Sequence, residues 1–231
     1  MNIATPPEVQ FNHPAPYLLP QTKALKAMHT IIRDKGAPHD VFVHTSRRIM
    51  RLLLEYAVDF LPHDNKTVET PSGGRYKGYE PALPVCGVSV LRAGDSMESE
   101  LRAILPSAPI GKILIQRDKQ THKPKFFFAN LPQDISDRFV LLLDPMLATG
   151  GTAVEALSTL QTHGVPQKNI IFVTLLSVAD GLRRVHSAFP EVRVVTSSIE
   201  ERLNDKALMV PGIGDFGDRY FGTSVSPAAM S

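Results

Sequence analysis

The residues best suited to chemistry lie in a short turn between two apolar segments. The turn covers residues 144–152 and reads Asp-Pro-Met-Leu-Ala-Thr-Gly-Gly-Thr, after the apolar run 139–143. A run of that length is typical of a strand buried on both faces, and apolar residues at helical spacing follow in 154–160. Glycines let a ligand approach the backbone, and a helix N-terminus presents unpaired N–H groups and partial positive charge. The pattern predicts a strand, an anion-binding turn and a helix.

Polar side chains in this turn add hydrogen bonds for a sugar. Thr149 and Thr152 supply hydroxyl donors, and Asp144 stands at the end of the strand, where its carboxylate can accept from sugar hydroxyls. A phosphate site beside a diol site indicates a phosphorylated ribose. The alternative is an ordinary capped connection between strand and helix. The acid, the Ala-Thr-Gly-Gly-Thr sequence and the flanking strand and helix patterns all indicate a binding turn, which argues against that alternative.

The string resembles the phosphoribosyl diphosphate (PRPP) motif of the type I phosphoribosyltransferases. Many members have two adjacent acids where this chain has Asp144-Pro145, and the Asp-Pro form is similar to the uracil phosphoribosyltransferase branch. The resemblance covers roughly residues 22–223. It implies that PRPP is bound by the residues of the turn: Asp144, Pro145, Met146, Leu147, Ala148, Thr149, Gly150, Gly151 and Thr152.

Two arginines follow other predicted strands. Arg92 leaves the apolar run 85–91 into a small loop, and Arg117 closes the run 110–117. In the superfamily the first position contacts the diphosphate, often beside a non-proline cis peptide, and in the uracil branch the second contacts the phosphoribosyl donor. Because a guanidinium holds two oxygens at once, arginine suits a diphosphate. The alternative for Arg92 is a pairing with a surface acid.

A glycine-rich segment near the C-terminus, residues 210–223, reads Val-Pro-Gly-Ile-Gly-Asp-Phe-Gly-Asp-Arg-Tyr-Phe-Gly-Thr. So many glycines predict a loop whose bare backbone can read the donors and acceptors of a planar base, although a terminal turn without a ligand is the alternative. The string is nearly that of the uracil branch. The match implies that Met209, Gly214, Asp215 and Phe216 form the uracil site, with Asp215 also facing the donor diphosphate. Met209 stands where the family usually has isoleucine, and a backbone contact tolerates that change.

The resemblance implies the reaction of uracil with PRPP to give UMP and diphosphate. Arg92, Arg117 and Asp215 are the expected catalytic residues. Negative charge gathers on the leaving diphosphate, and Arg92, Arg117 and Mg²⁺ are expected to meet it with fixed positive charge, while Asp215 is expected to face the diphosphate and its Mg²⁺. Mg²⁺ is the expected cofactor, held mainly by the diphosphate and water rather than by a protein site. Some relatives respond to GTP and form higher oligomers, so a GTP effector is expected without an assigned site.

Length, composition and charge limit the kinds of protein that this chain can be. The chain has 231 residues, 43% hydrophobic and 21% charged, with a net charge of +2, which is typical of one globular domain with appendages. The near-neutral charge argues against a nucleic-acid partner. A single cysteine, Cys86 in an apolar run, excludes a disulfide framework and indicates a buried thiol. Because no leader or bilayer-spanning stretch is visible, we expect no membrane partner and a cytoplasmic protein.

Strands alternating with helices predict an α/β fold of the type I phosphoribosyltransferase kind. We expect a central, mainly parallel sheet flanked by helices, with a β-hairpin arm, a flexible hairpin and a C-terminal base-binding loop. Ligands then gather at the carboxyl ends of the strands. The expected strands are 85–91, 110–117, 139–143, 169–176 and 192–196, and the expected helices are 22–35, 39–61, 95–105, 151–163 and 178–188.

Three segments are expected to lie outside the sheet. Residues 1–21 are Pro-rich and predict an extended arm before a domain of residues 22–231. Residues 67–79 predict a hairpin around a Pro-Ser-Gly-Gly turn, which the uracil branch uses between subunits, so a homodimer or homotetramer is expected. Residues 118–128 predict a polar hairpin hanging off the sheet, able to close over the donor.

Four other functions are alternatives to the uracil enzyme. A phosphoribosyltransferase for a purine base conflicts with the Asp144-Pro145 form and with segment 210–223. A pyrimidine-sensing RNA-binding regulator on the same fold needs a clustered basic surface, of which the sequence gives no obvious sign. A uridine or UMP kinase needs a G-x-x-x-x-G-K-[ST] loop, which the sequence lacks. A family member that has lost activity would show broken motifs.

Overall fold

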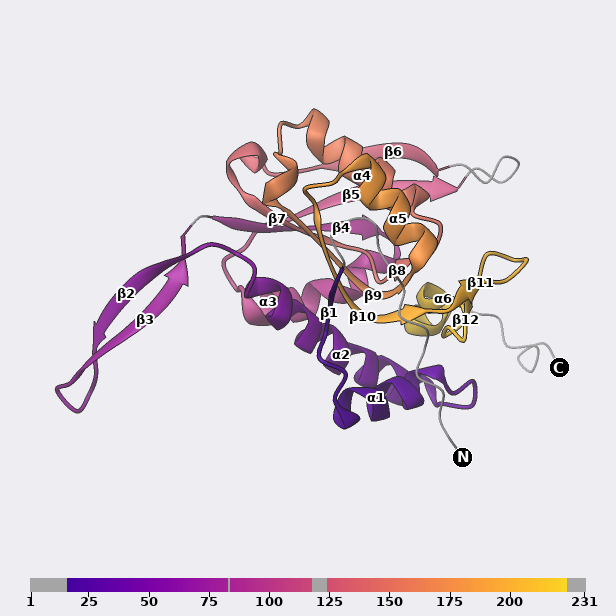
Figure 1. The fold of residues 1–231 in the computed structure, drawn as a ribbon, viewed down its shortest axis with the longest axis horizontal. Helices are drawn as coiled ribbons and strands as arrows, with labels where there is room; N and C mark the ends of the chain where they lie inside the picture. Colours follow the sequence, from indigo (N-terminus) through magenta and orange to yellow (C-terminus); the bar gives the residue numbers. More distant parts are fainter. Residues whose placement is uncertain (1–15, 83, 118–123, 224–231) are drawn as a thin grey trace.

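The computed structural model describes residues 16–82, 84–117 and 124–223. An eight-stranded sheet forms its centre, in the order β1-β10-β9-β7-β4-β5-β6, with β8 also paired to β9 (Figure 1). Only β6 is antiparallel to its neighbour among these strands. The strands are β1 (Tyr17–Leu18), β4 (Val85–Leu91), β5 (Ile110–Arg117), β6 (Pro124–Asn130), β7 (Phe139–Leu143), β8 (Met146–Leu147), β9 (Ile170–Val178) and β10 (Arg193–Glu200). The mainly parallel α/β sheet is confirmed.

Helices cover both faces of this sheet. One side carries α1 (Lys23–Arg33), α2 (His39–Val58) and α3 (Glu98–Ile104), and the other carries α4 (Gly151–Thr162) and α5 (Ala179–Ala188) (Figure 1). Short 3-10 turns lie at Ala93–Met97 (η1), Ile135–Asp137 (η2) and Gln167–Asn169 (η3). A parallel sheet needs both faces covered, which is why β7 is wholly apolar, β9 is largely apolar, and both are buried along their whole length.

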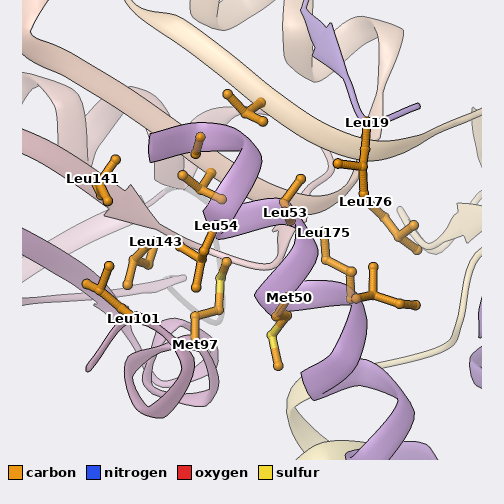
Figure 2. Close-up of a cluster of buried hydrophobic side chains, with 14 of the residues drawn as sticks. Leu19, Met50, Leu53, Leu54, Met97, Leu101, Leu141, Leu143, Leu175 and Leu176 are labelled. Atoms are coloured by element: carbon orange, nitrogen blue, oxygen red, sulfur yellow. The ribbon is translucent and has the colours of Figure 1, made fainter. Parts of the chain in front are cut away.

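The apolar face of α2 packs on the sheet through residues at helical spacing. Met50, Leu53 and Leu54 recur at helical spacing and are fully buried against Leu143 of β7 and Leu175 of β9 (Figure 2). Side chains three and four residues apart share one face of a helix. This packing fixes α2 on the sheet, and α1 then packs on α2.

Several helices and strands begin or end at other residues than expected. The expected helix 95–105 is η1 followed by α3, and the expected helix 39–61 ends at Val58. β10 continues to Glu200, four residues beyond the expected strand end at 196. Its extension is polar, and it stays regular because Ser197 Oγ donates to Leu175 O at 2.6 Å, inside the sheet. Polar strand residues of this kind give no apolar signal in the sequence.

Two of the expected appendages belong to the sheet. Tyr17 and Leu18, in the expected N-terminal arm, form β1 and pair in parallel with β10, while residues 1–15 lie outside the described part. Residues 118–128 were expected in a hairpin hanging off the sheet, and 118–123 of these lie outside the described part. Residues 124–128 belong to β6, the edge strand paired antiparallel to β5. That expectation was wrong because the edge of β5 offers unpaired backbone groups that a returning strand satisfies.

The hairpin arm is longer than expected. β2 (His63–Glu69) pairs with β3 (Arg75–Pro81) in an antiparallel ribbon that projects away from the domain (Figure 1). Near the C-terminus, β11 (Arg202–Leu203) pairs with β12 (Met209–Val210), and α6 (Phe216–Phe221) follows. Within the described ranges, no helix has both the length and the apolar content needed to cross a membrane.

Candidate active site

A cavity of about 460 Å³ lies at the carboxyl ends of β4 and β7. Register explains its position, because Ser89 of β4 pairs with Leu143 of β7, so both strands end at the same edge of the sheet. Its wall is made by Val90, Leu91, Arg92, Ala93, Ile115, Asp144, Met146, Ala148, Thr152, Ala207, Leu208, Met209, Gly214, Asp215, Phe216 and Gly217. The turn after β7 and the glycine-rich segment after β12 therefore face one space.

The donor turn, residues 144–152, combines the backbone groups at the start of α4 with the carboxylate of Asp144. Gly150 has φ of 76° and precedes α4, whose N-terminus has no side-chain cap and no acid in its first turn. A helix N-terminus of this kind attracts phosphate. Asp144 is only 8% exposed, and one of its oxygens accepts from the Met146 backbone N–H at 3.4 Å. The carboxylate is therefore oriented by its own turn.

Close packing behind the donor turn depends on one glycine of α5. A Cβ added at Gly181 would lie 2.3 Å from Ala148 O and 3.0 Å from Leu147 O. Since real Cβ atoms do not approach backbone oxygens so closely, only glycine lets α5 pack against this part of the turn. Gly181 was not predicted as a site residue, because its sole signal in the sequence is a glycine early in a predicted helix.

Arg92 stands at the mouth of the cavity. The Leu91–Arg92 peptide bond is cis, as the resemblance implied. The Arg92 side chain is 64% exposed and lies 3.3 Å from Asp218 Oδ1 of α6. This cation can therefore reach an anion in the cavity without first leaving a buried partner.

The base loop, residues 209–217, turns sharply twice. Gly212 and Gly214 have φ of 61° and 75°, and the Val210–Pro211 bond is cis. Asp215 then caps α6, accepting from the Asp218 N–H at 2.9 Å. Behind the loop, the Phe216 ring packs 5.9 Å from the Phe42 ring. The residues predicted for the uracil site all line the cavity: Met209, Gly214, Asp215 and Phe216.

Two further arginines tie the base loop to α1. Arg219 donates to Ile213 O at 2.8 Å and to Ile32 O at 2.7 Å, and its guanidinium lies 4.0 Å from the centre of the Phe42 ring. Burial lowers the pKa of Arg219, with Asp34 opposing that effect. Arg33 pairs with the buried Glu200. None of these charged residues was predicted from the sequence to have a role in the site.

The predicted site residues separate into three groups. Those that line the common cavity are Arg92, Asp144, Met146, Ala148, Thr152, Met209, Gly214, Asp215 and Phe216. The other members of the donor turn are not part of its wall: Pro145, Leu147, Thr149, Gly150 and Gly151. Leu147 is 1% exposed and packs in the core, so it can reach a ligand only through its backbone. Arg117 ends β5 beside Pro124, and its side chain lies outside the described part of the structure.

The carboxylates of the cavity suit a hard cation that arrives with a phosphate. Asp144 and Asp215 both line it, and Mg²⁺ binds through one or two carboxylates together with substrate oxygens and water. Across residues 16–82, 84–117 and 124–223, no group of three or more His, Cys, Asp or Glu side chains could hold a metal ion. The donor set fits a metal shared with the substrate better than a closed protein site.

Comparison with known proteins agrees with the geometry. The sequence model of the uracil phosphoribosyltransferase family matches residues 19–223. Uracil phosphoribosyltransferase 1 of Schizosaccharomyces pombe is 49% identical over 207 residues, covering 90% of this chain and 94% of the relative. The uracil phosphoribosyltransferase of Saccharomyces cerevisiae is 48% identical over 205 residues, covering 89% and 95%.

A solved structure shares this fold. The AQ2163 protein of Aquifex aeolicus superposes with a TM-score of 0.78 at 29% identity, covering 88% of this chain and 97% of that one. The cavity brings the donor turn and the base loop together, and the relatives match nearly the full length of the chain. This chain belongs to the uracil phosphoribosyltransferase family.

Proposed function

We propose that this chain transfers the 5-phosphoribosyl group of PRPP to uracil, giving UMP and diphosphate. One observation carries the proposal: Asp144 and Thr152 of the donor turn line the same cavity as Met209, Gly214 and Phe216 of the base loop. A charged sugar and a flat ring can therefore be held side by side. Holding both reactants in one site converts a bimolecular step into an effectively unimolecular one.

In the reaction, the bond from the anomeric carbon to the diphosphate oxygen breaks, the oxygen keeps the bonding electrons, and a bond to a uracil ring nitrogen forms as that nitrogen releases its proton to water. Negative charge gathers on the leaving diphosphate. Arg92, exposed at the cavity mouth, is placed to meet that charge, and Arg117 is proposed to meet it from the end of β5. No histidine among the described residues lines the cavity, so we assign no side-chain general base.

Mg²⁺ is the proposed cofactor. It would be held mainly by diphosphate oxygens and water, next to Asp215. When bound, it supplies Lewis-acid charge and holds the diphosphate in one geometry. The protein supplies the α4 N-terminus for the phosphate of the sugar and Asp144 for its hydroxyls.

The hairpin arm supports a homodimer or homotetramer. Every residue of β2 and all but one of β3 are exposed, including Tyr76 at 64% and Tyr79 at 75%. An isolated ribbon is marginal in water, so a second copy that covers these tyrosines would stabilise it. Light scattering of wild type and of Tyr76→Ser/Tyr79→Ser tests this, and an unchanged mass for the variant would contradict it.

Two finer expectations complete the proposal. The chain is proposed to act in the cytoplasm, in salvage of free uracil, and GTP is proposed as an effector. Adding GTP to the assay tests the effector, and an unchanged rate at every GTP concentration would remove it.

The reaction is tested by mixing the protein with Mg²⁺, PRPP and each free base in turn, and following nucleotide formation. UMP from uracil alone is the expected result. AMP, GMP or IMP instead would favour the purine alternative, and no nucleotide from any base would contradict the proposal.

A further inference from the structure

An ion pair between the partly exposed Arg33 and the buried Glu200 holds the base loop without lining the cavity. Arg33, the last residue of α1, donates from Nη1 to Glu200 Oε2 at 2.7 Å and from Nη2 to Glu200 Oε1 at 2.6 Å. Glu200 ends β10 and is 2% exposed. Ser198 Oγ also donates to Glu200 Oε1, at 3.0 Å. The pair joins the first helix of the domain to the carboxyl end of its sheet.

Both partners also bind the base loop through one residue. The Gly212 N–H donates to Glu200 Oε2 at 2.7 Å, and Arg33 Nη1 donates to Gly212 O at 3.1 Å. Both polar backbone groups of Gly212 are therefore held by the same ion pair. Hydrogen bonds to charged groups are shorter and stronger than neutral ones, so the backbone of Gly212 is strongly restrained.

The position of Gly212 also determines where the backbone on either side of it lies. A Cβ added there would lie 2.1 Å from Met209 O, so the chain folds back tightly on Met209 at this point. Gly214 follows two residues later and lines the cavity together with Met209. A shift of Gly212 would therefore move the backbone groups on both sides of the proposed base site.

We propose that Arg33 and Glu200 are positioning residues for base recognition, fixing Gly212 so that the backbone of Met209 and Gly214 is held ready for the pyrimidine. The inference rests on the proposed function. Neither side chain lines the cavity, so the pair acts through the loop and not on the reacting atoms.

Energetics agree with a positioning role. A buried ion pair often adds no net stability over well-packed apolar side chains, so stability alone is a weak reason to place one here. Burial alone would raise the pKa of Glu200, but the hydrogen bonds and charge of Arg33, with help from Gly212 and Ser198, hold that pKa below its usual value. The carboxylate therefore stays charged at neutral pH and keeps accepting from Gly212.

The test separates the two substrates. Glu200→Gln weakens the hold on Gly212 without changing side-chain size, and Arg33→Met removes the bonds that Arg33→Lys retains in part. We expect the uracil KM to rise about tenfold or more in Glu200→Gln and Arg33→Met, and less in Arg33→Lys, since small misplacements carry large kinetic costs. The PRPP KM and the Kd for PRPP with Mg²⁺ should stay within about twofold, which also shows that each variant is folded.

Glu100→Gln is the matched control. Glu100 is also 2% exposed and accepts from two arginines, Arg47 at 2.7 Å and Arg51 at 2.6 Å, but on α2 and α3 instead of at the base loop. Its removal should lower the melting temperature without a selective effect on uracil.

Two results would overturn the inference. One is an unchanged uracil KM in both Glu200→Gln and Arg33→Met. The other is a parallel loss of uracil and PRPP binding, the signature of a merely structural pair. If wild type made no UMP at all, the proposed function would fail instead, and PRPP binding by wild type would tell the two failures apart.

Discussion

The Arg92 guanidinium lies 3.3 Å from Asp218 Oδ1. This contact joins the loop after β4 to α6, the helix that begins at the end of the base loop. Both side chains are substantially exposed, at 64% and 40%. Exposed pairs contribute at most about 1 kcal/mol. A diphosphate carries more charge than one carboxylate and can therefore displace Asp218 from Arg92.

Asp218→Asn should tighten donor binding. Removing the competing carboxylate frees Arg92, so the PRPP KM should fall by up to about fivefold, the equivalent of about 1 kcal/mol. The control is Thr223→Val, because Thr223 Oγ1 donates to the same Asp218 oxygen at 2.7 Å and its loss leaves the carboxylate in place. A higher PRPP KM in Asp218→Asn would show that Asp218 assists the donor.

Arg117→Ala should lower kcat by about a hundredfold or more, because a fixed charge at the leaving group would be lost. Steady-state rates at saturating uracil and PRPP measure this. Arg138→Ala, which removes a surface pair with Asp134 at 2.7 Å, should leave kcat within about twofold. An unchanged rate for Arg117→Ala would remove Arg117 from the mechanism.

Gly181→Ala should damage the donor turn. The new Cβ would collide with Ala148 O and push the turn outward, at a cost of about 1 to 3 kcal/mol in unfolding free energy. The PRPP KM should rise about tenfold or more. Gly164→Ala is the control, since Gly164 has φ of 83° beyond the end of α4 and its substitution should reduce stability alone. Equal PRPP KM values for both variants would contradict the packing argument.

His29 should make the fold sensitive to mild acid. Burial lowers the pKa of His29 from 6.5 to about 4, with a further decrease from Arg33 and an opposing effect of Glu200. Between those pH values the unfolded chain binds the proton and the folded chain does not. The contribution of His29 is therefore fully present above pH 6.5 and is lost as the pH falls toward 4, in total about 3 kcal/mol.

Unfolding free energies at pH 7 and pH 4.5 check this prediction. The decrease should be smaller in His29→Gln than in wild type, while His44→Gln, at an exposed position of α2, should behave like wild type. Equal decreases in wild type and His29→Gln would show that His29 does not carry the effect.

Local patterns predicted the parts of the fold that depend on local interactions. The apolar runs that became β4, β7 and β9 are buried on both faces, so their composition alone marks them. Cys86 is fully buried in β4, and burial raises its pKa to about 12, which fits the expected unreactive thiol. The donor turn was visible because glycine, threonine and an acid are adjacent in sequence.

The missed features depend on residues far apart in the chain. Arg33 and Glu200 look like ordinary charges at the end of a helix and of a strand, and only the folded chain brings them together around Gly212. β6 was misplaced for a similar reason, since its position depends on the free edge of β5. Gly181 gave no sign of the contact that it makes with Ala148.

A crystal structure of the protein with uracil and an unreactive PRPP analogue tests the central claim most directly. We expect the phosphoribosyl group on the donor turn at Asp144 and Thr152, and the uracil ring in the same cavity against the backbone of Met209 and Gly214. Uracil bound away from the base loop, or a base loop that contacts no ligand while the donor turn is filled, would contradict the account.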